Sequence, residues 1–238
     1  MNNNLFICFQ RGFIKRKNIP LTDDIILFDT YDLLKKTKFS NISEWRKLDY
    51  LGIPFPPAEA NYQFPKELYL VFKKKQTDFQ FNYLEYGSDV KILSVDLFNA
   101  LGDNGLSKEQ YECAALQLVD KSGNQLSEKK YCALRFGNFN DEQFIFNKQT
   151  AVKTKINGST NYLYPDLALK QSIPRNIFML KEFSYRNSFI IAGIDTATAL
   201  AKKFTDLDIY SIKDFPFIYQ NQYNEDELPV NNRFTLTH

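Results

Sequence analysis

The chain has 238 residues, of which 44% are hydrophobic and 24% charged, proportions that are ordinary for a globular protein. Its 30 basic and 28 acidic residues leave a net charge of +2, so overall charge favours neither a nucleic acid nor an acidic partner. No stretch approaches the roughly 18 to 20 uninterrupted apolar residues of a membrane-spanning helix, and the first residues lack the basic leader of a secretory signal. We therefore expect a cytoplasmic protein with no membrane or nucleic-acid partner.

The N-terminal third contains few regular elements. We expect strands over 5–9 and 25–28, where apolar runs have strand length, and either a short capped helix or a turn over 29–36. Four prolines between residues 51 and 65 remove backbone donors and disfavour helix. This Pro-rich segment fits two arrangements: a linker after a smaller N-terminal lobe (1–65), or a surface loop on a single domain spanning 1–238.

The remainder of the chain predicts strands alternating with a few short helices. We expect strands over 68–72, 90–95, 113–119, 130–136, 144–146, 151–156, 177–180, 189–192 and 207–212, and helices over 96–101 and 195–204. A turn at 120–124 joins two of these strands into a hairpin, and residues 144–156 form a further strand pair or meander. This order predicts an α+β fold of mostly antiparallel mixed sheet with a few short helices.

Two stretches far apart in the chain resemble each other. Residues 92–101 and 190–200 each run from an apolar strand through an aspartate, Asp96 or Asp195, into a helix that carries Ala-Leu one turn later. A carboxylate suits the first turn of a helix because it can accept hydrogen bonds from the exposed amide groups there. The repeat predicts two strand–helix–strand units.

The sequence lacks the residues of the common catalytic and cofactor sites. Its single histidine is the last residue, His238, which argues against Ser-His and Cys-His catalysis and against His-ligated metals. No glycine-rich phosphate loop or dinucleotide motif is present, and Cys8, Cys113 and Cys132 have no metal-binding spacing. We therefore expect no catalytic, cofactor-binding or metal-binding residue, no cofactor, and no enzymatic activity.

Aspartates close together in sequence keep one enzymatic alternative open. They fall in two clusters: Asp23, Asp24, Asp29 and Asp32, and Asp206, Asp208 and Asp214. A carboxylate acts as a general acid or base when burial or a neighbouring charge shifts its pKa. Turn and helix-capping roles account for most such residues, so a carboxylate-dependent enzyme is the alternative rather than the main prediction.

Residues 90–215, roughly, resemble bacterial immunity proteins of polymorphic-toxin systems, of the immunity protein 43-like or immunity protein 11-like kind. The resemblance lies in the Ile-Leu-Ser-Val-Asp-Leu phrase at 92–97, the hairpin over 116–134, the Ile-Phe-Met-Leu phrase at 177–180 and the second unit at 189–200. Members commonly end the second unit with a glycine-containing strand, whereas this chain has Leu-Asp-Ile-Tyr at 207–210. The resemblance implies a bacterial protein that binds and neutralises a cognate toxin in a stoichiometric complex and that has no catalytic residues.

Such an inhibitor needs an exposed complementary surface, often rich in tyrosine and acidic side chains. The candidate partner-binding residues are Asp29, Tyr31, Asp32, Tyr62, Tyr219, Tyr223, Glu225, Asp226 and Glu227. Because the chain is not acidic overall, a basic nuclease is not favoured as the toxin. A structural or adaptor module without a toxin is a third possibility beside the inhibitor and the enzyme.

Overall fold

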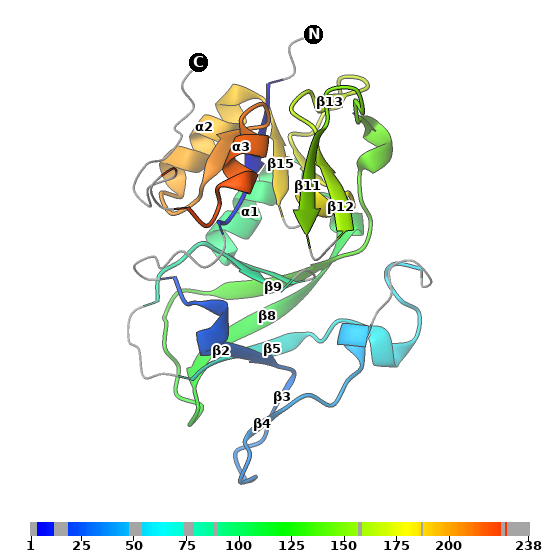
Figure 1. Cartoon of the computed structure of the whole chain (residues 1–238). Coiled ribbons are helices and arrows are strands. Elements are labelled where there is room, and N and C mark those ends of the chain that lie inside the picture. The colour runs from blue at the N-terminus through cyan, green and yellow to red at the C-terminus, as the bar shows by residue number, and fades with distance from the viewer. Residues whose placement is uncertain are drawn as a thin grey trace. The chain divides into compact units, whose positions relative to one another are not determined.

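The computed structural model describes residues 4–11, 19–47, 54–73, 79–87, 90–156, 159–186, 188–224 and 227. They form two compact units, each made of segments that are far apart in the sequence (Figure 1). The six-stranded unit comprises the described residues within 15–99 and 108–138, and the four-stranded unit comprises those within 1–14, 100–107 and 139–238. The units interleave along the chain, so neither coincides with the N-terminal lobe over 1–65, which stays a prediction.

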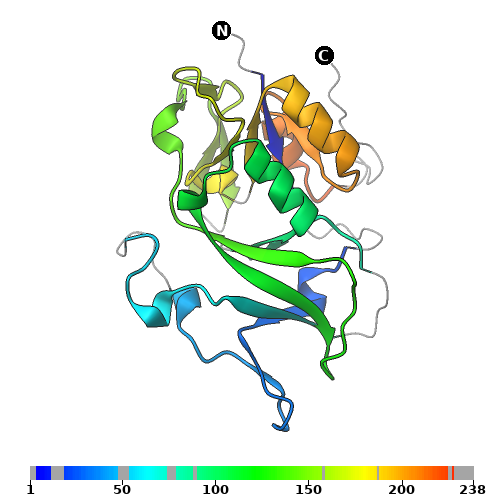
Figure 2. The same ribbon diagram turned by 180° about the vertical axis from the view of Figure 1, so that it is seen from behind.

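One mixed sheet forms the six-stranded unit, in the order β2-β5-β8-β9-β7-β6. Its strands are β2 (Ile25–Phe28), β5 (Glu67–Phe72), β6 (Tyr83–Tyr86), β7 (Val90–Ser94), β8 (Tyr111–Asp120) and β9 (Tyr131–Phe136). All neighbours are antiparallel except β5 and β8, which run parallel. Figure 2 shows β8 and β9 as a long green hairpin, which confirms the pairing expected across 120–124.

An apolar core lies against one face of this sheet. Along β8, the side chains of Ala114, Leu116 and Leu118 are buried in it, whereas the alternate residues Cys113 and Gln117 are exposed. This alternation follows from the two-residue period of a strand. The face that carries the exposed residues of β8 is called the outer face below.

The sheet curls until its two edge strands approach each other. Leu27 of β2 donates its backbone N–H to the Tyr86 hydroxyl of β6 over 3.1 Å, and the Arg46 guanidinium donates to the Leu27 carbonyl. β2 and β6 are the first and last strands of the sheet order. Side chains thus satisfy edge groups that would otherwise offer a template for a further strand.

The four-stranded unit contains an antiparallel sheet in the order β14-β15-β1-β16. Its strands are β1 (Leu5–Cys8), β14 (Ile177–Met179), β15 (Phe189–Ala192) and β16 (Ile209–Ser211), and its helices include α2 (Ile194–Lys203) and α3 (Phe215–Gln220). Aromatic rings fill its core: Phe9 meets Phe215 edge to face at 5.2 Å between centroids, and Phe215 lies 5.1 Å from Tyr185. The third helix, α3, has six residues with proline near its start and was not predicted from the sequence.

Short ladders and single helical turns complete the chain. The ladders join β3 (Thr30–Tyr31) to β4 (Phe39–Ser40), β10 (Phe144–Ile145) to β13 (Ala168–Leu169), and β11 (Val152–Ile156) to β12 (Ser159–Leu163). The 3-10 turns are η1 (Thr22–Asp24), η2 (Trp45–Lys47), η3 (Ala60–Tyr62), η4 (Lys108–Gln110), η5 (Asp141–Gln143) and η6 (Phe183–Tyr185). The expected pairing within 144–156 was wrong, because β10 pairs with β13 and β11 with β12.

The two strand–helix–strand units confirm the sequence repeat as a repeat of topology. One is β7, α1 (Val95–Asp103) and β8, and the other is β15, α2 and β16. In each, the two strands run parallel to each other with one antiparallel strand between them, β9 in the first and β1 in the second. In the first strand–helix–strand unit, the inserted strand β9 comes directly after β8. In the second, the inserted strand is β1, which comes from the N-terminal end of the chain.

The aspartates do not cap the two helices by side-chain hydrogen bonds, although the sequence led us to expect this. Asp96 and Asp195 lie in the first turns of α1 and α2, where a negative charge suits the helix dipole. At α1, however, the Ser94 hydroxyl accepts the hydrogen bond from the backbone N–H of Leu97, over 3.2 Å. At α2 the cap is Gly193, whose φ of +89° few residues with a side chain adopt.

Together these elements give the expected α+β class, with antiparallel and mixed sheets and a few short helices. Within the described ranges, no helix has the length and apolar character needed to cross a membrane.

Candidate interaction surface

Aromatic rings hold the base of the β3–β4 hairpin on the outer face of the six-stranded sheet. The Phe39 ring, 7% exposed, lies 5.8 Å from Phe28 of β2, 5.9 Å from Tyr69 of β5 and 4.8 Å from Tyr31, measured between centroids. Such ring pairs contribute about 0.5–1.5 kcal/mol each beyond their buried area. The hairpin base, with its predicted contact residue Tyr31, is therefore packed rather than loose.

Asp29 ties the start of the hairpin to its end. Its carboxylate accepts hydrogen bonds from the backbone N–H groups of Ile42 (2.9 Å) and Ser43 (3.2 Å), and from the hydroxyls of Ser43 (2.5 Å) and Thr30 (3.0 Å). Burial alone raises the pKa of Asp29, but these hydrogen bonds outweigh it and hold the pKa below its usual value of 3.8. The predicted contact residue Asp29 thus acts within the fold as a clamp.

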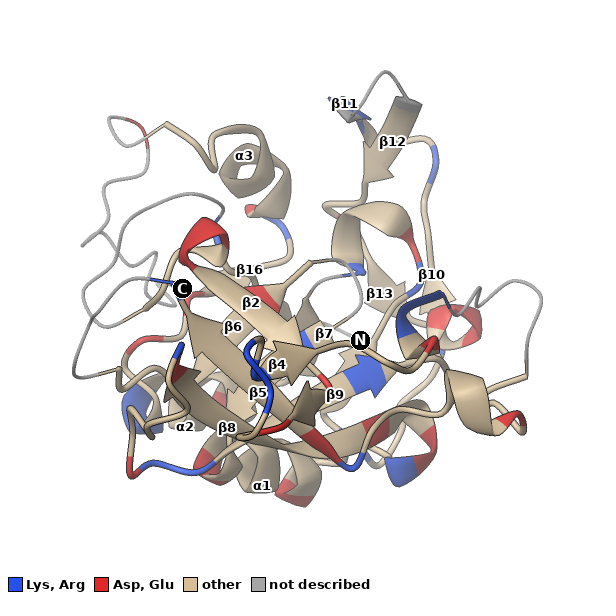
Figure 3. Ribbon diagram, turned by 90° about the horizontal axis from the view of Figure 1, so that it is seen from below, with Lys and Arg blue, Asp and Glu red and all other residues tan. Residues whose placement is uncertain are grey.

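At the tip, residues 32–38, a tight turn presents two leucines to solvent. Asp32 organises it: its backbone N–H donates to the Lys38 carbonyl over 2.7 Å, and its carboxylate accepts from the Leu34 N–H over 3.0 Å. The Leu34 side chain is 94% exposed and that of Leu33 63%. Figures 1 and 2 both show the hairpin projecting from its unit, and Figure 3 shows its basic loop in blue.

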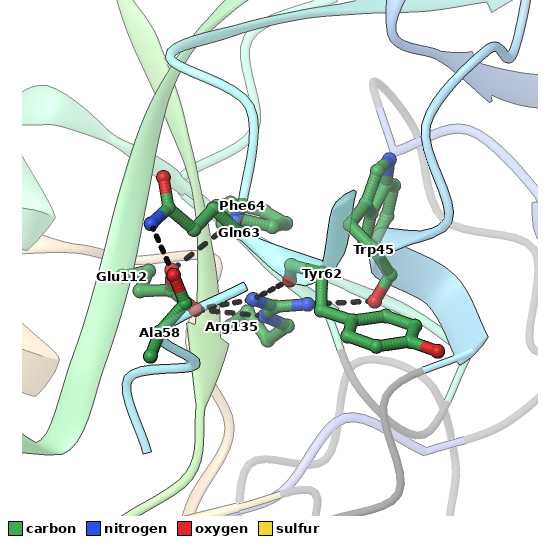
Figure 4. A network of polar contacts seen from close by, with 7 residues as sticks. All are labelled: Trp45, Ala58, Tyr62, Gln63, Phe64, Glu112 and Arg135. Carbon is green, nitrogen blue, oxygen red and sulfur yellow. Dashed lines mark hydrogen bonds and ion pairs between the residues drawn. The ribbon is translucent and has the colours of Figure 1, made fainter. Parts of the chain in front are cut away.

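A buried ion pair joins the backbone at Trp45 and at residues 62–64 to the six-stranded sheet (Figure 4). Arg135 of β9, 1% exposed, pairs with Glu112 of β8 and donates to the carbonyls of Trp45 (2.6 Å) and Tyr62 (2.7 Å). Glu112 in turn accepts the backbone N–H of Phe64 over 3.1 Å. The predicted contact residue Tyr62 is therefore held through its backbone, with its side chain half-buried.

The other predicted contact residues belong to the four-stranded unit. Tyr219 is half-buried, and its ring centroid lies 5.7 Å from that of Phe9 and 5.5 Å from that of Phe215. Tyr223, in contrast, is 64% exposed, and Glu227 is also exposed. Glu225 and Asp226 lie outside the described residues. The structure thus brings Asp29, Tyr31 and Asp32 together on one hairpin, and the role of all these residues in binding stays a prediction.

Sequence reasoning missed the exposed leucines of the hairpin tip. Leu33 and Leu34 follow Asp32 and precede Lys35 and Lys36, so an apolar pair stands between turn-forming and charged residues. An apolar pair in this setting can indicate an exposed turn. The sequence alone does not show that this pair is exposed, because exposure depends on tertiary packing.

One carboxyl group outside the aspartate clusters has altered acidity. Burial and the nearby charge of Asp141 raise the pKa of Glu182. The Asp141 carboxylate accepts the backbone N–H groups of Lys181 (2.7 Å) and Glu182 (3.0 Å), which secures the loop after β14. Across the described part of the chain, no group of three or more His, Cys, Asp or Glu side chains could hold a metal ion.

The three cysteines are all free thiols. Cys113 is exposed on the outer face, whereas Cys8 and Cys132 are buried. A hydrogen bond from the Cys132 thiol lowers the pKa of Cys113. Cys113 is consequently the thiol best placed to react with a reagent in solution.

Comparison with known proteins gives one family. The sequence model of the family described as immunity protein 43 matches residues 14–227. This match confirms the resemblance stated for 90–215 and extends it over most of the N-terminal third. No curated protein matches the chain.

Proposed function

The chain belongs to the immunity protein 43 family, and from this membership we propose that it neutralises a cognate bacterial toxin by binding it in a stoichiometric complex. The family match over most of the chain carries the proposal, since an immunity protein implies a toxin as its partner. The chain acts in this account as an inhibitor, in keeping with the non-enzymatic role that the family suggests.

Two local observations support binding rather than catalysis. The carboxylates of Asp29 and Glu112 are engaged in hydrogen bonds that hold the fold together, which leaves them poorly suited to shuttle protons. The hairpin tip instead offers adjacent exposed apolar side chains on an ordered turn, and such side chains are typical of interaction sites.

Co-expression tests the proposal directly. The gene adjacent to this chain's own gene is expressed in a sensitive bacterial host, alone and together with this chain, and the two products are then co-purified. We expect growth to be restored and a one-to-one complex to be recovered. Toxicity that this chain fails to relieve, with no complex formed, would contradict the proposal.

A variant of the same experiment tests the proposed cytoplasmic site of action. This chain is fused to a secretion signal and directed to the periplasm while the toxin stays in the cytoplasm. We expect rescue to be lost, because a stoichiometric inhibitor must meet its toxin. Continued rescue by the exported chain would place its action elsewhere.

A further inference from the structure

We propose that the tip of the β3–β4 hairpin, residues 32–38, is the element that docks on the toxin, with Leu33 and Leu34 entering an apolar pocket whose rim carries carboxylates. This inference rests on the proposed function, since it names the surface of this chain that makes the complex and the chemistry of the partner surface.

The first observation is the exposure of the leucines. Leu34 is 94% and Leu33 63% exposed, so neither contributes much buried area to this chain's own core. Adjacent exposed apolar side chains of this kind are typical of interaction sites, whereas single exposed ones are ordinary surface.

The second observation is that the tip is ordered before any partner binds. The Asp32 backbone N–H bonds to the Lys38 carbonyl, the Leu34 N–H bonds to the Asp32 carboxylate, and the Lys35 N–H bonds to the Asp32 carbonyl over 3.3 Å. Lys38 also reaches the turn after β8, where its Nζ donates to the Ser122 carbonyl over 3.2 Å. A preorganised loop loses little conformational freedom on binding, so apolar contacts at its tip convert efficiently into affinity.

The third observation is the charge around the leucines. The tip carries Lys35, Lys36 and Lys38, and its one acid, Asp32, is engaged by the Leu34 N–H and by Lys35, whose Nζ lies 3.6 Å from the carboxylate. The adjoining turn adds Lys121, and the Asp120 carboxylate beside it accepts hydrogen bonds from Ser122 and Asn124. The local surface is therefore basic although the whole chain is nearly neutral, and complementarity requires carboxylates on the partner.

The same charges argue against a second copy of this chain as the occupant. A two-fold dimer through the tip would set the lysines of one copy against those of the other. Like charges brought together in this way disfavour association. The toxin, which differs in sequence from this chain, can supply the opposite charge.

The test measures affinity of purified full-length chain for the co-purified toxin. The variant Leu33→Asp/Leu34→Asp removes the apolar tip, and Ile145→Asp is the matched control, since Ile145 is 48% exposed in the four-stranded unit. We expect the double variant to weaken binding by about 100-fold or more, as loss of a central apolar anchor does. The control should bind within about 3-fold of the unchanged chain. Because the replaced leucines are exposed, the double variant should keep its circular dichroism spectrum and midpoint of thermal unfolding.

A charge-reversal variant, Lys35→Glu/Lys36→Glu, tests the acidic rim separately. We expect it to slow association by about 10-fold at low salt. Because carboxylates then face carboxylates, added salt should speed the association of this variant, whereas it slows that of the unchanged chain; the same rate and salt dependence as the unchanged chain would contradict the acidic rim.

The outcomes separate the two proposals. If the folded double-leucine variant binds and rescues as well as the unchanged chain does, the hairpin proposal is overturned while the proposed function stands. If the unchanged chain does not bind the toxin at all, both are overturned. A dimer of the chain alone that dissociates in the double variant would assign the tip to self-association and would also overturn the hairpin proposal.

Discussion

Replacing Arg135 with methionine should release the segment around Trp45 and destabilise the six-stranded unit. The side chain is 1% exposed and joins Glu112 to the carbonyls of Trp45 and Tyr62. Removing one partner of a buried ion pair typically costs about 3–5 kcal/mol. The loss of the hydrogen bonds to the two carbonyls adds a further cost of about 1 kcal/mol each. Since Glu112 keeps 17% of its side-chain surface exposed and can be hydrated, we expect the loss of the ion pair to lie near its lower bound. Together with the two hydrogen bonds, the total cost should be about 5 kcal/mol.

Trp45 provides the assay, because it is the single tryptophan of the chain and is 3% exposed. Urea unfolding is followed by its fluorescence. With a slope of about 1–3 kcal/mol per molar urea, the midpoint should fall by at least about 1 M, and the native emission should shift to longer wavelength. The control Lys153→Met removes an exposed cation from the four-stranded unit and should leave both unchanged.

A second variant distinguishes a shared network from independent contacts. Glu112→Gln removes the negative charge but keeps an oxygen that can accept the Phe64 N–H. If Arg135 and Glu112 act as one unit, Glu112→Gln should cost much less in the Arg135→Met background than in the unchanged chain. Additive effects, or a midpoint shift below about 0.3 M for Arg135→Met, would refute the reasoning.

Three further predictions concern the hairpin and the outer face. Because the folded pKa of Asp29 lies below 3.8, its stabilising effect is complete above that pH and is lost as pH falls through the folded pKa. Acid titration of unfolding should therefore be flatter below pH 3.8 for Asp29→Asn, and an unchanged titration curve would show that the clamp contributes nothing. Gly123 has a φ of +90°, and a Cβ there would collide with the Tyr31 hydroxyl. Gly123→Ala should thus lower stability by about 1–3 kcal/mol and speed hydrogen exchange in β3 and β4; normal exchange would contradict the packing of the hairpin base. Native iodoacetamide labelling should modify Cys113 before Cys132, with a midpoint below pH 9 that rises in Cys132→Ala. Equal labelling of both thiols, or a midpoint that does not move, would be inconsistent with the hydrogen bond between them.

The sequence predicts local elements well and long-range pairing less well. The strand–aspartate–helix phrases around Asp96 and Asp195 located both strand–helix–strand units, because their apolar runs and helix starts depend on neighbouring residues. That β1 inserts between β15 and β16 could not be predicted, since nothing local in Leu5–Cys8 specifies a partner near the other end of the chain. The same limit explains the wrong pairing expected within 144–156.

The interaction surface shows a similar division. Asp29, Tyr31 and Asp32 were identified from their types and proximity, and they do share one hairpin. Their engagement in clamps and ring contacts depends on Ser43, Phe39 and other residues that sequence alone does not bring together. The exposure of Leu34 is likewise set by tertiary packing. Its apolar side chain would suggest a place in the core, yet the structure presents it to solvent.

Titration of toxin activity with the purified chain tests most directly the claim that it neutralises its toxin by stoichiometric binding. The toxin is held at a fixed concentration well above the dissociation constant, and residual activity is measured as the chain is added. The account predicts a linear fall that reaches zero at one equivalent and does not change with incubation time. Complete, time-dependent inactivation by a small fraction of an equivalent would indicate catalysis, and undiminished activity at excess chain would indicate no inhibition; either result would contradict the account.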